Sequence, residues 1–143
     1  MRNKLLRGAP GKQQLSVPTA AEMRLLQILW EREESTVEEV VNAHPEKERP
    51  HYKTTQTLLR IMEQKGFIAH ESRGRVFVFR PLVSRKTIDY LSVQALLSRN
   101  FNGSVSTLLI KLLEARPFNR KGLDELEAHI REHRKRYELG DRE

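Results

Sequence analysis

A polar helix, a glycine and a short basic hairpin follow one another between residues 51 and 80. Residues 52–65 are polar and rich in threonine, and Gly66 can adopt the positive φ that ends a helix. Two short predicted strands, 68–71 and 75–79, are separated by a Ser-Arg-Gly turn, which is the pattern of a β-hairpin. An isolated hairpin is marginal in water, so one face must lie on helices. The segment therefore predicts a winged helix-turn-helix, with the hairpin as its wing.

Two helices are expected before this segment. Thr19 has Glu22 three residues on, which is a capping box, and apolar residues then recur at helical spacing up to residue 32. Thr36 with Glu39 repeats the capping signal and indicates a second helix of about two turns. The residues that follow contain two prolines and several charges, so we expect a loop before the polar helix.

The pattern after residue 82 is helical to the end of the chain, with breaks near residues 102 and 117. Three thin amphipathic helices make a poor independent core, because small domains bury too little surface. We expect them to pack against a second copy, since closed two-fold dimers are the commonest oligomers. The alternative is that they fold back on the N-terminal unit. The expected dimer contacts are Leu91, Leu108, Leu112, Leu123, Leu126 and Ile130.

The sequence thus predicts a mainly α fold with a small β-hairpin. We expect a basic flexible tail at 1–17, a winged-helix domain at 18–82 and a helical dimerisation domain at 83–143. The tail carries four basic residues and no acid. It can either act as an arm that reaches along DNA or remain loose, as exposed termini usually do.

Charge is distributed unevenly along the chain, whose formal net charge is +7. Residues 22–48 carry three basic and eight acidic residues, whereas residues 49–80 carry seven basic and two acidic residues. The positive charge therefore gathers on the polar helix and the hairpin. Such clustering suits a polyanion, whose binding is driven by counterion release, although a solvated basic surface has the same composition.

Threonine and glutamine can hydrogen-bond base edges in a major groove, and arginine and lysine hold phosphates. The predicted contacts with double-stranded DNA are Lys53, Thr54, Thr55, Gln56, Thr57, Arg60, Arg73 and Arg75. A protein-interaction module is the alternative, because winged helices also serve as docking domains.

Composition excludes several other classes. The chain has 143 residues and no cysteine, which removes disulfides and thiolate metal sites. No apolar run approaches the roughly 20 residues of a membrane helix, and the first 17 residues lack the apolar stretch of a secretion signal. We expect a cytoplasmic protein with no cofactor.

One catalytic pattern occurs, in the last predicted helix. His129 to His133 satisfies the H-x-x-E-H pattern of zinc peptidases, with Glu132 as the acid. A third ligand is missing nearby, and His133 lies in the apolar seam of the helix. We expect structural histidines, no metal and no enzyme activity. A regulatory metal on the two histidines is a minor alternative.

The chain resembles the penicillinase and methicillin-resistance repressor family of bacteria (BlaI/MecI-like). The motifs that carry the resemblance are Pro18-Thr19-Ala20-Ala21-Glu22 with Trp30, Tyr52-Lys53-Thr54-Thr55-Gln56-Thr57-Leu58-Leu59-Arg60, Lys65-Gly66-Phe67-Ile68, and Gly74-Arg75-Val76-Phe77 leading to Pro81-Leu82-Val83-Ser84. The resemblance implies a homodimeric transcriptional repressor that binds two-fold operators. It places Lys53, Thr54 and Thr57 on the recognition helix and Arg73 and Arg75 at the wing.

The resemblance also implies that the repressor controls an inducible response to β-lactams or cell-wall stress. A membrane sensor-protease system would relieve the repression. In the resistance repressors this system cuts an Asn-Phe bond, but the matching position here is Lys111-Leu112, and Asn100-Phe101 lies one segment earlier. Many members have Arg at the position of Ile61, so the resemblance does not determine the operator sequence. The copper-responsive relatives need C-terminal cysteines, which this chain lacks.

Overall fold

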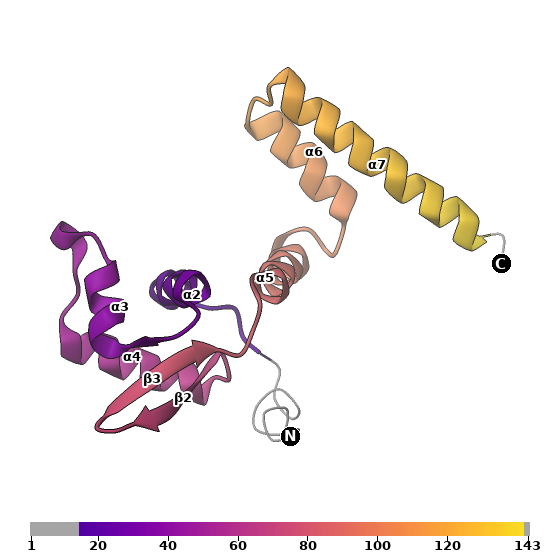
Figure 1. Ribbon diagram of the computed structural model, residues 1–143. Helices are drawn as coiled ribbons and strands as arrows, with labels where there is room; N and C mark the ends of the chain where they lie inside the picture. Colours follow the sequence, from indigo (N-terminus) through magenta and orange to yellow (C-terminus); the bar gives the residue numbers. More distant parts are fainter. Residues whose placement is uncertain (1–14, 142–143) are drawn as a thin grey trace. The chain divides into compact units, whose positions relative to one another are not determined.

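The computed structural model describes residues 15–141, so most of the predicted basic tail lies outside the described residues. The chain divides into two compact units, the first ending at Leu96 and the second beginning at Leu97 (Figure 1). The element order of the first unit is helix, short strand, helix, helix and two-stranded wing. This order confirms the predicted winged helix.

The first helix, α2 (Ala20–Arg32), begins at the capping box that the sequence predicts. The Thr19 hydroxyl accepts the N–H of Glu22, and the Glu22 carboxylate accepts the N–H of Thr19. The two backbone N–H groups, which have no carbonyl partner within the helix, thereby gain a hydrogen bond. The apolar face of α2 is fully buried and forms the centre of the core through Leu25, Leu26 and Leu29.

The second helix, α3 (Val37–Ala43), also begins at a capping box. Thr36 and Glu39 exchange the reciprocal capping hydrogen bonds, which confirms the second predicted capping box. Val37, Val40 and Val41 are buried against α2 and the third helix. A single 3-10 turn, η1 (Glu46–Glu48), occupies the loop that the two prolines predict.

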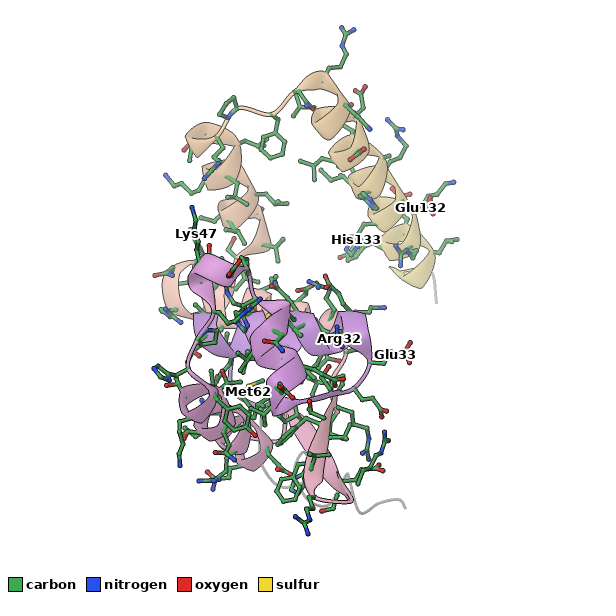
Figure 2. All side chains as sticks on the ribbon, turned by 60° about the vertical axis from the view of Figure 1, so that its left-hand side comes forward. Arg32, Glu33, Lys47, Met62, Glu132 and His133 are labelled. Atoms are coloured by element: carbon green, nitrogen blue, oxygen red, sulfur yellow. The ribbon has the colours of Figure 1, made fainter. Side chains whose placement is uncertain are left out.

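The third helix, α4 (Tyr52–Gln64), ends as predicted, because Gly66 has φ 91° and turns the chain toward the wing. Leu59 and Met62 are fully buried against the core, and Figure 2 labels Met62 in the interior of this unit. The residues of the opposite side of α4 are exposed to solvent. Helix α4 therefore packs on the core through one face and exposes its other face to solvent.

The wing consists of β2 (Ile68–Arg73) and β3 (Val76–Pro81), which pair antiparallel around Gly74 at φ 66°. Sequence reasoning missed a third strand, β1 (Ser35–Thr36), which pairs with the other edge of β3. Its two residues are too few to have a recognisable period. The sheet order is β1-β3-β2, so β3 is central, and both Val78 and Phe79 are buried there.

The helix α5 (Arg85–Asn100) continues the core of the first unit at its beginning. Ile88 is fully buried in the core cluster, and Leu91 packs against it. The Trp30 indole N–H donates to the Val83 carbonyl at 2.8 Å, and the Arg85 guanidinium lies 4.7 Å from the centre of the Trp30 ring. The connection after the wing is thus tied to α2.

The second unit contains α6 (Val105–Ala115) and α7 (Arg120–Asp141), which form a helical hairpin (Figure 1). Ser104 caps α6 by accepting the N–H of Thr107, and Asn119 accepts the N–H of Gly122 at the start of α7. Among residues 15–141 no helix is both long enough and apolar enough to cross a bilayer.

Candidate nucleic-acid interface

Three residues form a solvent-exposed ridge on α4, which we call the reading ridge: Lys53, Thr57 and Ile61. They are spaced by four residues, so they lie one above the other on a single helix face. Thr54 and Arg60 are exposed beside this ridge. The ridge combines a cation, a hydroxyl and an apolar side chain, which is a surface suited to the floor of a DNA groove.

The other two predicted contacts on α4 are placed differently. Thr55 is 2 % exposed and packs into the interior, so its side chain supports the fold and does not lie on the reading ridge. Gln56 is half-buried on the flank of the helix. The helical phase explains this separation, because Thr55 shares its face with the buried Leu59 and Met62.

The first turn of α4 differs from those of the two helices before it. Helices α2 and α3 each begin at a threonine cap with a glutamate in the first turn. Helix α4 has neither a side-chain cap nor an acidic residue in its first turn. Its initial N–H groups and the positive end of its dipole are therefore open to an anion.

A partly buried ion pair ties the end of α4 to the start of α2. The Lys65 ammonium donates to the Glu22 carboxylate at 2.8 Å, and the Glu22 side chain is almost completely buried. Burial opposes ionisation of Glu22, but the hydrogen bonds from Lys65 and from the Thr19 N–H outweigh it, so the pKa of this carboxyl lies below its ordinary value. The pair holds α4 in register with the helix behind it.

A second contact joins α4 to the wing. The His70 ring nitrogen Nδ1 lies 2.7 and 2.9 Å from the two carboxylate oxygens of Glu63, and the His70 ring stacks on Phe77 with centroids 4.2 Å apart. Sequence reasoning missed this cluster, because its members come from α4, β2 and β3. The hairpin register could have indicated it, since His70 lies opposite Phe79 and diagonal to Phe77.

The two predicted wing arginines have different surroundings. Arg73 donates two hydrogen bonds to Glu34, at 2.7 and 3.0 Å, and one to Glu71 at 3.0 Å. These bonds raise the pKa of Arg73 and lower that of Glu34. Arg75 is exposed, and within the part of the chain described here it has no ion-pair partner. Arg75 is therefore the wing cation that is open to an external anion.

The second unit carries an apolar groove of about 540 Å³ between α6 and α7. Val105 and Leu109 line one side, and the other side includes Leu126 and Ile130. Of the six predicted dimer residues, five lie on α6 or α7, and Leu91 packs on the winged-helix core.

His129 and His133 also line this groove. Figure 2 shows His133 on the α6 side of α7 and Glu132 on the other side, so the acid of the H-x-x-E-H pattern does not face the same space as His133. No group of three or more metal-ligating side chains occurs among the described residues.

Comparisons with known proteins extend this description. The family model of the penicillinase repressor matches residues 18–132. The penicillinase repressor of Bacillus licheniformis is 28 % identical over 118 residues, covering 81 % of this chain and 91 % of that protein. The methicillin resistance regulatory protein MecI of Staphylococcus aureus (strain N315) is 20 % identical over 108 residues, covering 76 % and 88 %.

A solved structure, the solution structure of the DNA-binding domain of the repressor BlaI, is 26 % identical with a TM-score of 0.46, covering 51 % of this chain and 89 % of that chain. The family match spans most of the chain and includes the reading ridge, the wing, α6 and the first part of α7. The members of this family are regulators that bind DNA and are not enzymes. The chain belongs to the penicillinase repressor family and is a DNA-binding transcriptional repressor.

Proposed function

We propose that this repressor is a homodimer that binds two-fold operator sites through α4 and the wing. In each half-site, α4 enters the major groove and the reading ridge faces the base edges. Lys53 and Thr57 can hydrogen-bond base edges or adjacent phosphates from this position. The observation that carries the proposal is the exposed polar face of a helix whose other face is fixed by burial and by the Glu22–Lys65 pair.

Three features of α4 and the wing support contacts with DNA phosphates. The first turn of α4 is free of acid and of a side-chain cap, Arg60 is exposed on the helix, and Arg75 is exposed at the wing turn. Each can bind a phosphate oxygen of the DNA backbone, and such a contact does not discriminate between base sequences. Binding should therefore weaken steeply with salt, because each neutralised phosphate releases counterions.

Dimerisation is supported by the apolar surface of the second unit. Exposed apolar side chains gather on α6 and α7, among them Leu112, Leu123 and Ile130, and the groove between the helices is lined by more. Contiguous apolar patches of this kind usually mark an interaction site. A second copy covers this surface and sets two half-sites about 10 base pairs apart, or a multiple of that spacing.

The names of the relatives support an inducible response. One is a penicillinase repressor and another regulates methicillin resistance. We infer that this repressor binds its operator in the cytoplasm and controls a response to β-lactams or cell-wall stress. A membrane sensor-protease system is the partner proposed for its release.

The test measures operator affinity and oligomeric state together. A duplex selected from a random-sequence library by the full-length protein serves as the probe, titrated at several salt concentrations. Lys53→Ala and Thr57→Val should weaken binding to this duplex more than binding to a scrambled one. Leu126→Asp should turn the dimer into a monomer in analytical ultracentrifugation and reduce affinity.

Three results would count against the proposal. Binding that is independent of salt would contradict the phosphate contacts. A monomeric wild-type protein with full affinity would contradict the dimer. Retention on heparin without binding to duplex DNA would favour a protein-interaction module.

A further inference from the structure

The reading ridge ends in an apolar side chain. Ile61 is 38 % exposed, although it lies on the same helix face as Lys53 and Thr57. An exposed isoleucine on a surface that meets DNA has no hydrogen bond to offer. It either remains against water or contacts an apolar group of the ligand.

A shallow hollow of about 490 Å³ lies beside Ile61. Its lining is mainly apolar and comes from two helices: Ala21 of α2, and Lys53, Thr54, Thr57, Leu58 and Ile61 of α4. Leu58 in this lining is half-buried, and each of the two threonines carries a methyl group as well as a hydroxyl. The hollow therefore belongs to the same face as the proposed base-reading residues.

The chemistry of the major groove identifies what can fill such a hollow. Base pairs present hydrogen-bond donors and acceptors there, and the apolar group among them is the C5-methyl of thymine. Lys53 at the rim adds a positive charge, which suits a polyanion better than an apolar protein segment.

We propose that the hollow beside Ile61 receives a thymine methyl group, so that Ile61 makes the repressor specific for a T·A pair at one position of each half-site. This inference rests on the proposed function, because it requires α4 to lie in the major groove. It adds a specificity-determining residue that reads by apolar contact instead of by hydrogen bonding.

The experiment removes single methyl groups from the DNA. The full-length protein first selects a duplex from a random-sequence library. Each thymine of that duplex is then replaced in turn by deoxyuridine, which lacks only the C5-methyl group, and affinity is measured for each. One position per half-site should lose about fourfold in affinity, the value for removing one buried methyl group.

Variants of Ile61 connect that position to the hollow. Ile61→Ala should bring the ratio of affinities for the thymine and deoxyuridine duplexes close to one, and Ile61→Val should keep most of it. Val93→Ala is the matched control, because Val93 is also an exposed β-branched side chain but lies on α5, outside α4 and the wing. It should leave the ratio unchanged. Thermal melting checks that each variant is folded, as expected for exposed positions.

The outcomes separate the two proposals. If Lys53→Ala and Thr57→Val weaken binding but no deoxyuridine substitution does, the thymine contact is refuted and the proposed function stands. The same conclusion follows if Ile61→Ala keeps the full ratio. If the Lys53 and Thr57 variants bind the selected duplex as tightly as the wild type, α4 is not the reading helix and the proposed function fails first.

Discussion

The Arg73 guanidinium in the wing donates to both carboxylate oxygens of Glu34, at 2.7 and 3.0 Å, although the two residues are 39 positions apart in the chain. Glu34 lies just after Glu33, the C-cap of α2, which has φ 73°. That turn directs the chain toward β1, and Figure 2 labels Glu33 at the end of α2. The wing is thus fixed to the end of α2 by a bidentate ion pair, whose charges would otherwise be open to DNA.

Removing the acid of this pair should strengthen DNA binding. Glu34→Gln removes the charge of the bidentate partner and leaves Arg73 with its single hydrogen bond to Glu71, so the guanidinium is more available to a phosphate. We expect tighter binding to every sequence and a dependence of log affinity on log salt that is steeper by about 0.9. Fluorescence anisotropy with a selected and a scrambled duplex measures both.

Glu33→Gln is the control for this variant, because it changes the net charge equally at a residue without an ion pair in residues 15–141. Equal effects of the two variants would mean that only net charge matters. Weaker binding by Glu34→Gln would mean that the pair serves to hold the wing in its binding position.

The two wing arginines should differ in their contribution to affinity. Arg75→Gln should weaken binding to all sequences and reduce the salt slope by about 0.9, because an unpaired cation is removed. Arg73→Gln should have a smaller effect on the slope, since Glu34 and Glu71 already neutralise that charge. A larger loss of slope for Arg73 would show that DNA displaces its carboxylate partners.

The Glu22–Lys65 pair should make the free energy of unfolding depend on pH. The pKa of Glu22 is lowered in the folded protein, so its contribution is present above the ordinary value of 4.5 and is lost as the pH falls through the lower, folded value. Glu22→Gln keeps a capping acceptor but removes the charge, and should cost about 1–2 kcal/mol of unfolding free energy at neutral pH. Urea unfolding at several pH values measures this difference, which should shrink toward low pH.

Glu31→Gln is a suitable control, since Glu31 is exposed on the same helix and forms no ion pair within the described part of the chain. A difference between wild type and Glu22→Gln that is the same at every pH would contradict the linkage.

Trp30 should stabilise the connection between the wing and α5. Trp30→Phe removes the N–H that donates to the Val83 carbonyl, while keeping an aromatic ring beneath Arg85. We expect a loss of about 1 kcal/mol in urea unfolding. Arg85→Met removes only the cation–π contact and should cost about 0.5 kcal/mol. A larger loss for Arg85→Met than for Trp30→Phe would reverse the assigned importance of the two contacts.

The local features of this fold could be predicted because they depend on neighbours in sequence. Thr19 and Thr36 each meet a glutamate three residues on, so both capping boxes are visible in the sequence and present in the structure. Gly66 ends α4 for an equally local reason, since a positive φ is easiest for glycine. Helical phase also separates the exposed Lys53 and Thr57 from the buried Leu59.

The sequence by itself determined the helices, the wing and the polar reading face of α4, because capping, turn chemistry and periodicity act over a few residues. Only the tertiary structure decided that Ser35 and Thr36 form a third strand on β3, and that Arg73 pairs with Glu34 while Arg75 stays open. It also decided that Ala21 of α2 completes the hollow beside Ile61. These relationships join residues far apart in the chain, and their energies depend on distances and burial that no short sequence pattern encodes.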